Sequence, residues 1–328
     1  MRLLVLGGTV FLSKAVAAEA VARGHEVTCA ARGTSGPPPD GATLVTVDRD
    51  GPDGLAPLAG QGFDAVVDVA AISYPWVAEA LDVLGGKAGH WTFVSTVNVY
   101  SDDVTQGQSP GAPLVAPLRE GTTRDGEIEK YGAIKVASED AVRDAMGDRA
   151  FVVRPGLITG PGDRSDRFGY WPARFHRGGR AVVPAPSEQP IQHIDVRDLA
   201  SWIVTAGEQR IAGTFDGIGP VRPLDDVLRE IAAVAGGGAE LVPIPPEALK
   251  AAGVQPWGGQ KSLPLWLPPS HWGVSSHDPA ASIDAGLRPR PLAETVAGAL
   301  ATEQELGLDR ERKAGLSADE EAAVLAAA

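Results

Sequence analysis

The first half of the chain alternates short apolar runs with segments in which apolar residues recur at helical spacing. The apolar runs predict strands at residues 3–6, 26–30, 44–47, 65–68, 91–95 and 151–154. Helices are predicted at 11–23, 76–84 and 131–145. The strands are apolar at consecutive positions, which is typical of a parallel sheet covered by helices on both faces. We therefore expect an α/β fold whose doubly wound parallel sheet occupies residues 1–155.

The pattern becomes less regular after residue 155, where proline and tryptophan are more frequent. One more strand is predicted at 213–219, and we expect it to return to the first sheet. Further predictions are a helix at 224–235, an ordered loop at 256–273, and a last helix that begins at the capping residue Ser317. The chain is thus expected to divide into residues 1–155 and a smaller mixed α/β lobe with C-terminal helices, residues 156–328.

Charge and composition exclude several classes of partner. The chain has 328 residues and a formal net charge of −13, so its surface repels nucleic-acid backbones and anionic lipids. Cys29 is the only cysteine, which excludes an internal disulfide and fits a reducing compartment. The apolar run before Gly7 is too short for a signal peptide or a membrane span. We expect a cytoplasmic protein without a nucleic-acid or membrane partner, and we expect no metal ion.

Residues 2–16, RLLVLGGTVFLSKAV, have the pattern of a strand that leads into a phosphate-binding turn and a helix. In Rossmann-like dinucleotide sites three glycines serve the tight turn, the approach to the pyrophosphate, and close helix–strand packing. Gly7 satisfies the first role, whereas Val10 and Ser13 stand at the other two positions. The main-chain N–H groups at the start of the helix attract anions whatever the side chains are. The turn alone is therefore compatible with a dinucleotide site and with an ordinary strand–helix connection.

Polar residues follow the next two predicted strands. The second strand ends without the Asp or Glu that would hold a ribose 2′-hydroxyl, and Arg32 stands close to its end. An arginine there suits the 2′-phosphate of NADP, and the alternative is a solvated loop arginine. Asp48, with Arg49 beside it, is placed to accept from an adenine amino group, or is a turn residue. These positions favour NADP(H) over NAD(H).

The segment EKYGAIKVASED (129–140) places Tyr131 and Lys135 on one face of a predicted helix. A neighbouring ammonium would lower the pKa of the phenol, so that Tyr131 exchanges a proton with a substrate oxygen while a nicotinamide carries the hydride. Lys135 would also hold the nicotinamide ribose. The fifth strand ends in Ser95 and Thr96, whose hydroxyls lie at the edge where ligands of such sheets bind. The alternatives are a surface Tyr–Lys pair and an ordinary strand terminus.

Together these motifs resemble the extended short-chain dehydrogenases/reductases, and more narrowly the NAD-dependent epimerase/dehydratase group. The similar stretches are GGTVFL (7–12), Asp48, VDVAA (67–71), Ser95–Thr96 with Tyr100, Tyr131 with Lys135, and Arg154–Pro155 with Gly160–Pro161. The resemblance covers roughly residues 1–300 and implies catalytic roles for Thr96, Tyr131 and Lys135. It also implies cofactor contacts by Gly7, Thr9, Val10, Phe11, Leu12, Val69, Ala70, Ala71, Tyr131, Lys135, Pro155, Gly156 and Ile158.

The chain also departs from that group. Val97 and Asn98 stand where sugar-nucleotide 4,6-dehydratases carry an Asp-Glu pair, which argues against water elimination by that route. Gly156 and Leu157 replace the Phe-Asn of sugar-nucleotide 4-epimerases, which weakens the case for a nucleotide diphosphate sugar. Val10 and Ser13 put the affinity for the cofactor in question.

Five arginines between residues 164 and 180 suggest recognition of an anionic substrate, or form a solvated face. Arg174 is the predicted contact, because it lacks acidic neighbours in sequence. Gln192 and His193 are further candidates from the resemblance, although His193 is equally explained as a structural histidine. Ser95 and Asn98 complete the predicted substrate contacts. Trp257, Trp266 and Trp272 would form an apolar lid, or would pin a long loop.

The sequence thus predicts an NAD(P)(H)-dependent oxidoreductase or epimerase that acts on a small hydroxy or keto metabolite by Tyr-assisted hydride transfer. The substitution at Val10 motivates an alternative from another class, a non-catalytic NAD(P)-binding sensor or regulator on the same fold. The resemblance also implies a homodimer through a helix pair that would include residues 131–145.

Overall fold

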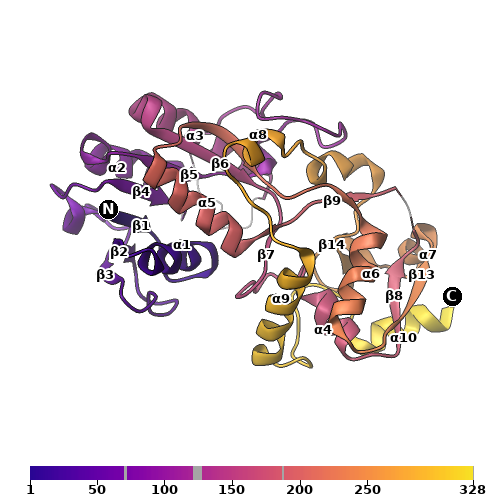
Figure 1. Cartoon of the computed structure of the whole chain (residues 1–328). Coiled ribbons are helices and arrows are strands. Elements are labelled where there is room, and N and C mark those ends of the chain that lie inside the picture. Colours follow the sequence, from indigo (N-terminus) through magenta and orange to yellow (C-terminus); the bar gives the residue numbers. More distant parts are fainter. Residues whose placement is uncertain (70–71, 121–127, 187, 328) are drawn as a thin grey trace.

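The computed structural model describes residues 1–69, 72–120, 128–186 and 188–327 (Figure 1). Within these residues seven strands form one parallel sheet in the order β11-β6-β5-β4-β1-β2-β3. The strands are β1 (Arg2–Leu6), β2 (Glu26–Ala31), β3 (Thr43–Thr46), β4 (Ala65–Asp68), β5 (Trp91–Val94), β6 (Ala150–Pro155) and β11 (Gly213–Gly217). The order reverses between β1 and β4, and open parallel sheets bind ligands at the carboxyl ends of the strands at such a point.

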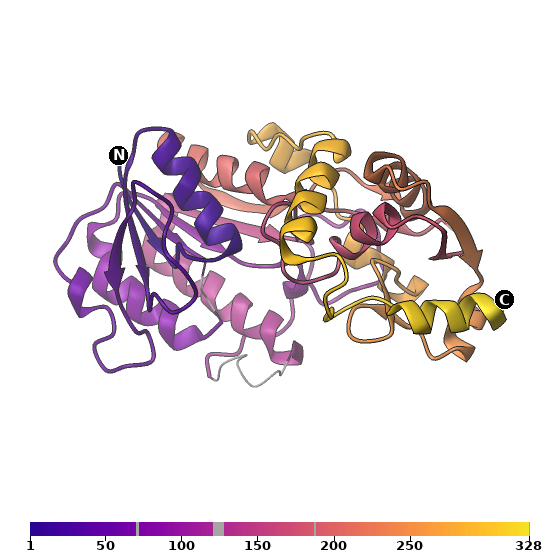
Figure 2. The same ribbon diagram turned by 90° about the horizontal axis from the view of Figure 1, so that it is seen from below.

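Helices cover both faces of this sheet. α1 (Phe11–Ala22) and α5 (Val196–Gln209) lie on one face, and α2 (Tyr74–Leu84) and α3 (Ile128–Met146) lie on the other (Figure 2). Consecutive side chains of β1 point to opposite faces of the sheet. Leu3 and Val5 belong to the core under α1 and α5, and Leu4 and Leu6 belong to the core under α2. The predicted doubly wound α/β class is confirmed, and so is each strand predicted within residues 1–155.

The strand predicted at 213–219 is β11, which pairs in parallel with β6 at one edge of the sheet. α5 precedes it, and the side chain of Asp195 caps α5 by accepting from the N–H of Arg197 at 2.8 Å. Beside β11 lies the short helix α8 (Ala280–Asp284). Part of the second half of the chain therefore completes the layers of the first half.

The remaining elements build the C-terminal lobe, most of them around a core of its own. Ile158 and Ile194, on two strands that pair with each other, belong instead to the core under α1 and α5. Its helices are α4 (Tyr170–His176), α6 (Leu224–Ala235), α7 (Pro246–Ala251), α9 (Leu292–Leu306) and α10 (Ala318–Ala327). Its strand pairs are β7 (Ile158–Thr159) with β10 (Ile194–Asp195), β8 (Arg180–Pro184) with β13 (Glu240–Ile244), β9 (Pro190–Ile191) with β12 (Arg222–Pro223), and β14 (Gln255–Trp257) with β15 (Ser262–Pro264). As predicted, Ser317 caps α10: its hydroxyl accepts from the N–H of Glu320, whose carboxylate accepts from the N–H of Ser317 at 2.8 Å.

The prediction of an ordered loop at 256–273 is wrong in part, because the segment contains regular elements. β14 and β15 pair in parallel across this segment, and a 3-10 helix spans Pro269–Ser275. Prolines are compatible with such a pair because each strand has only one neighbour, so a proline lacking an N–H group breaks no ladder on its other side. Among the described residues, no helix is both long and apolar enough to span a bilayer.

Candidate functional site

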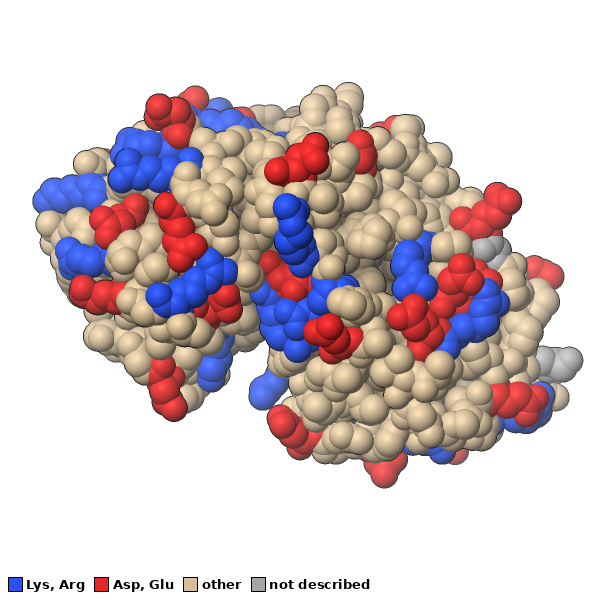
Figure 3. Space-filling model, in the orientation of Figure 1, with Lys and Arg blue, Asp and Glu red and all other residues tan. Residues whose placement is uncertain are grey.

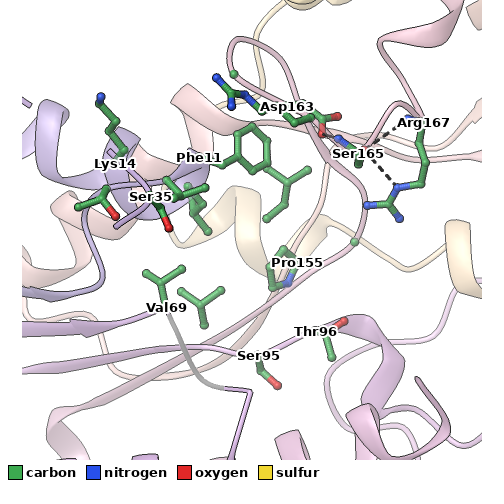
Figure 4. Close-up of a pocket in the computed structure, with 18 of the residues that line it drawn as sticks. Phe11, Lys14, Ser35, Val69, Ser95, Thr96, Pro155, Asp163, Ser165 and Arg167 are labelled. Atoms are coloured by element: carbon green, nitrogen blue, oxygen red, sulfur yellow. Dashed lines mark hydrogen bonds between the residues drawn. The ribbon is translucent and has the colours of Figure 1, made fainter. Parts of the chain in front are cut away.

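A large cavity lies at the carboxyl ends of the strands, between the β1–α1 turn and the C-terminal lobe. Its volume is about 1100 Å³. Figure 3 shows the hollow that separates the part of the molecule around α1 from the part around α9. Residues from the β1–α1 turn, from the ends of β5 and β6, and from the segment 162–167 line the cavity (Figure 4). The cavity therefore lies at the edge of the sheet where the sequence predicts that a ligand binds.

The β1–α1 turn is built on glycine backbone conformations. Gly7 and Gly8 have φ of +124° and +95°, and a Cβ on Gly8 would lie 2.4 Å from Sγ of Cys29. Val10 precedes α1 in extended conformation and is 51% exposed, so valine does not fill the turn. Ser13 closes the first turn by donating its hydroxyl to the carbonyl of Val10 at 2.8 Å.

The residues of this turn fit a dinucleotide pyrophosphate. The first turn of α1 carries no acidic side chain that would repel an anion. The N-terminus of α1 lies at the wall of the large cavity, which is lined by Thr9, Val10, Phe11, Leu12 and Lys14. Phe11 takes a left-handed φ of +39°, and its ring extends into the cavity (Figure 4). Strained backbone of this kind is common at ligand sites.

A second cavity of about 170 Å³ adjoins the turn on the side of β2 and β3. Arg32 and Asp48 line it and are exposed, as expected for groups that meet an adenosine. Arg49 also lines it, and its guanidinium is buried, ion-paired with Asp68 at 2.9 Å and bonded to the carbonyl of Trp76 at 2.6 Å. Arg49 therefore supports the wall, and its contact with a cofactor stays a prediction. Val69 lines the large cavity, and Ala70 and Ala71 lie outside the described residues.

Tyr131 and Lys135 occupy successive turns of α3 and line the large cavity together. Nζ of Lys135 lies 5.6 Å from the centre of the Tyr131 ring and donates to the carbonyl of Val94 at 2.7 Å. Burial lowers the pKa of Lys135 to about 8, although Asp68 and Glu139 favour the ammonium. The predicted juxtaposition of phenol and ammonium is confirmed.

The predicted cause of a reactive phenol is corrected. Burial raises the pKa of Tyr131, while a hydrogen bond with Thr96 and the positive charge of Arg167 lower it. The ammonium of Lys135 is turned toward the backbone of β5 instead. Groups on the opposite wall of the cavity therefore tune the phenol, together with the threonine at the end of β5.

The end of β5 places its hydroxyl side chains in two different environments. Thr96 caps the 3-10 helix Val97–Val99 by accepting from the N–H of Asn98 at 3.2 Å, and its side chain lies at the cavity (Figure 4). Ser95 is buried and donates to the carboxylate of Glu139 at 2.5 Å, so its hydroxyl is committed to the protein. Ser95 nevertheless lines the cavity, as does the exposed Asn98, so their contacts with substrate stay predictions.

A buried ion-pair network behind the site was missed by the sequence analysis. Arg154 pairs with Glu139 through two bonds of 2.6 and 2.9 Å, and Arg154 also donates to the hydroxyl of Tyr100 at 3.0 Å. Glu139 lies one turn after Lys135 on α3, so the network fixes α3 against β5 and β6. Beyond it, Pro155, Gly156 and Ile158 line the large cavity, as the resemblance implied.

Three predicted substrate contacts lie elsewhere. Arg174 is buried, and its Nε donates to the carboxylate of Glu321 at 2.6 Å. Glu321 lies 147 positions further along the chain, so the residues next to Arg174 in the sequence did not indicate this partner. Gln192 uses its amide to join Gly219 and His277. His193 packs on the ring of Phe168, and burial lowers its pKa to about 4, so the ring is neutral at physiological pH. All three hold the lobe together and line none of the three cavities at the site.

Arg167 is a site residue that the sequence analysis did not select. It lines the large cavity and a third cavity of about 520 Å³, whose apolar wall includes Leu157, Trp257, Leu267 and Val274. Of the three tryptophans predicted as a lid, Trp257 lines this cavity. The sequence analysis did not select Arg167 as a substrate contact because acidic residues adjoin it in the sequence. In the structure, Asp166 instead forms ion pairs with Arg310 and Arg312.

The chain is similar to known proteins over most of its length. Residues 3–215 match the NAD dependent epimerase/dehydratase family. The epimerase family protein SDR39U1 of Bos taurus is 27% identical over 290 residues, which cover 80% of this chain and 92% of that protein. UDP-N-acetylglucosamine 4-epimerase from Bacillus cereus superposes with a TM-score of 0.69 at 16% identity, over 94% of this chain and 98% of that one.

A further solved structure is the enzyme WbmH of Bordetella bronchiseptica in complex with NAD+. It superposes with a TM-score of 0.66 at 17% identity, over 93% of this chain and 99% of that one. At these identities the two structures establish a shared fold. The family match spans more than half of the sequence and agrees with the glycine turn, the Tyr–Lys pair and the sheet order described above. The chain belongs to the NAD dependent epimerase/dehydratase family.

Proposed function

We propose that this protein is an NAD(P)(H)-dependent oxidoreductase or epimerase of a small hydroxy or keto compound, with Tyr131 exchanging a proton with the substrate oxygen. The observation that carries the proposal is a single cavity that begins at the bare first turn of α1 and ends at Tyr131, Lys135 and Thr96. Membership of a family of NAD-dependent epimerases and dehydratases supports it.

Each part of the cavity has a role in this proposal. A nicotinamide dinucleotide, when bound, would supply the capacity to accept and return a hydride. The N–H groups of α1 bind its pyrophosphate, and Lys135 bonds its ribose. Tyr131 holds the proton at its phenolic oxygen, and Thr96 orients that oxygen through their hydrogen bond. Val97 and Asn98 offer no carboxyl group for acid–base elimination of water, so the proposal favours oxidation and reduction over dehydration.

NADP(H) is the preferred cofactor in this proposal. β2 ends without an acidic residue, and the exposed Arg32 lines the cavity at its end. Replacement of Arg32 by alanine would remove a charge-assisted bond to the 2′-phosphate, which is typically worth a 10- to 100-fold change in affinity, about 1.5–3 kcal/mol. R32A should therefore weaken NADPH binding by this factor and leave NADH binding unchanged.

Cofactor binding and turnover test the proposal in two steps. Thermal shift and nucleotide fluorescence with NAD+, NADH, NADP+ and NADPH should show binding of NADPH; absence of any response to all four would overturn the proposal. Turnover on a panel of alcohols and ketones should then fall at least about 100-fold in Tyr131→Phe, a typical share for general acid–base catalysis. Tyr74→Phe, on α2 and outside the cavity, is the matched control.

Two outcomes separate the alternatives. Intact turnover in Tyr131→Phe would refute the role of the phenol. Cofactor binding without turnover on the whole panel would favour the non-catalytic sensor that the valine in the turn first suggested.

A further inference from the structure

The segment after β7 carries Arg167 across the opening between the two cavities. It is fixed from the C-terminal side, because the buried Asp166 pairs with Arg310 and accepts from the N–H of Lys313 at 2.8 Å. Asp163, the other acid of the segment, accepts from the N–H of Ser165 at 2.8 Å. Asp166 is thus committed to residues 310–313. One oxygen of Asp163 is committed to Ser165, and its other oxygen has no hydrogen-bond partner among the described residues.

The guanidinium of Arg167 remains available at the cavity wall. Nε lies 3.4 Å from the hydroxyl of Ser165, as Figure 4 shows, and the guanidinium carbon lies 5.6 Å from the centre of the Trp257 ring. Among the residues that the structure describes, no carboxylate forms an ion pair with Arg167, and Asp163 is the acidic side chain whose charge acts on it. Burial lowers its pKa, with Asp163 and Tyr131 acting in the opposite direction. A half-buried, oriented arginine of this kind is a typical receptor for a carboxylate.

Arg167 also stands between two chemically different spaces. On one side it lines the cavity of Tyr131 and Thr96, and its charge is felt by the phenol. On the other side it lines the cavity of about 520 Å³, whose wall is mainly the apolar surface of Val97, Leu157, Trp257, Leu267, Pro268 and Val274. A molecule that occupies both cavities and matches their walls has a negatively charged group at Arg167 and an apolar body in the cavity of about 520 Å³.

We infer that the substrate is a hydroxy or keto acid with an apolar body, whose carboxylate binds Arg167 and whose body fills the cavity at Trp257. The inference rests on the proposed function for the reacting oxygen at Tyr131, and it names the substrate class of that same site. It differs from recognition of a nucleotide, because the surface of this cavity is mainly apolar. Asn98, Asp103, His271 and Ser275 add polar side chains to its wall, and Arg167 is the only arginine or lysine among its described lining residues.

The carboxylate requirement is tested by binding, so that it does not depend on turnover. A panel of 2- and 3-keto acids and hydroxy acids with aliphatic or aromatic bodies, each beside its methyl ester, is titrated against the protein alone and with NADP+. The acids should bind at least about 10-fold more tightly than their esters, the usual size of a charge-assisted bond. Arg167→Met should abolish this preference, and Arg167→Lys should retain part of it. Arg177→Met, an exposed arginine at the end of α4 outside the cavities at the site, should keep it.

Three results would overturn the inference. They are acids and esters that bind equally, an acid preference that survives in Arg167→Met, and a panel in which no acid binds. Loss of NADP+ affinity in Arg167→Met would also overturn it, since the arginine would then serve the cofactor. Failure of the proposed function has a different signature: no nicotinamide cofactor binds, or Tyr131→Phe retains turnover, whatever the acids do.

Discussion

Lys135 is a fully buried cation, and its burial makes a prediction about stability. Burial lowers its pKa from the ordinary value of 10.5 to about 8. Below about pH 8 the amine is charged in both folded and unfolded chains. Between about pH 8 and 10.5 the folded protein has lost this proton while the unfolded chain still binds it, so the free energy of unfolding rises with pH.

The measurement compares wild type with Lys135→Met in urea at pH 7.5 and at pH 10. Relative to the variant, the wild type should gain about 2 kcal/mol between these two pH values, because each unit of pKa shift corresponds to about 1.4 kcal/mol and most of the shift falls between them. Subtracting the variant cancels the other titrating groups. A difference that stays constant with pH would show that the amine is not desolvated as the structure implies.

Tyr131 and Arg167 show how far a single residue was predictable. Tyr131 and Lys135 were identified because a helix brings residues four apart onto one face, a rule that holds within one element. Arg174 was selected and Arg167 passed over because only neighbours along the chain could be weighed. The partner of Arg174 lies 147 residues away, and the partners of Asp166 come from residues 310–313. Charge pairing between distant segments is decided by tertiary structure.

The contact between α3 and the end of β5 depends on one glycine. A Cβ on Gly132 would lie 2.1 Å from the carbonyl oxygen of Asn98, so α3 reaches this close only without a side chain there. Gly132→Ala should therefore displace Tyr131 from Thr96. Stability should fall by about 1–3 kcal/mol, as in overpacked contacts, although alanine in an ordinary helix position stabilises by up to about 1 kcal/mol.

The comparison is made by thermal unfolding and by kcat/KM, which should fall at least about 10-fold because a small displacement of a catalytic group is costly. Gly86→Ala is the control, since a Cβ at Gly86 meets no atom within 4 Å. A Gly132→Ala protein as stable and as active as this control would contradict the role assigned to the glycine.

The last helix is attached to the lobe by a buried ion pair. Glu321 on α10 bonds Nε of Arg174 at 2.6 Å and accepts from the main-chain N–H of Val182 at 2.9 Å. Removing one partner of such a pair leaves the other charge buried and typically costs 3–5 kcal/mol. Glu321→Gln should therefore lower the unfolding midpoint and raise hydrogen exchange in α10 and β8.

Asp226→Asn provides the control, because its pair with Arg229 on α6 is exposed and such pairs contribute little. Its unfolding midpoint should match wild type. If Glu321→Gln also matched wild type in midpoint and in the exchange of α10, the pair would have no anchoring role.

The elements themselves were predicted best where one physical rule is sufficient. Strands buried on both faces need continuous apolar runs, so β1, β4 and β5 are evident from sequence. The pair β14–β15 was missed because its segment contains Pro256 and Pro264, which usually exclude strands. Residues 255–257 pair with residues 262–264, which follow shortly after them in the sequence, and Trp257 in this pair lines the cavity. The pairing of these two strands depends on tertiary structure, so the spacing of apolar residues along the chain does not predict it.

The molecule as a whole is not two successive halves. α5 packs against α1, and β11 extends the sheet beside β6, although both come after residue 155. The cavity is lined by both parts of the chain: the turn and α3 from the first, and Arg167 from the second. Residues 156–328 therefore contribute a layer of the sheet domain as well as a lobe. The expected homodimer through α3 remains a prediction, which the mass of the protein in solution would check.

This interlocking predicts how the chain responds to division. A fragment of residues 1–155 retains six strands but loses β11 and α5, which cover Phe151 and Val153 on β6 and Ala17 and Ala20 on α1. Uncovering these buried apolar side chains removes the stabilisation of about 25 cal/mol for each Å² returned to water. The fragment should therefore lack a cooperative urea transition and should bind a hydrophobic dye. In the full-length chain, hydrogen exchange of α5 and β11 should rise in urea together with that of β1 and β6, because the four elements share one core. A cooperative transition in the fragment, or early exchange of α5 while β1 stays protected, would instead show that residues 1–155 fold without the layer that follows them.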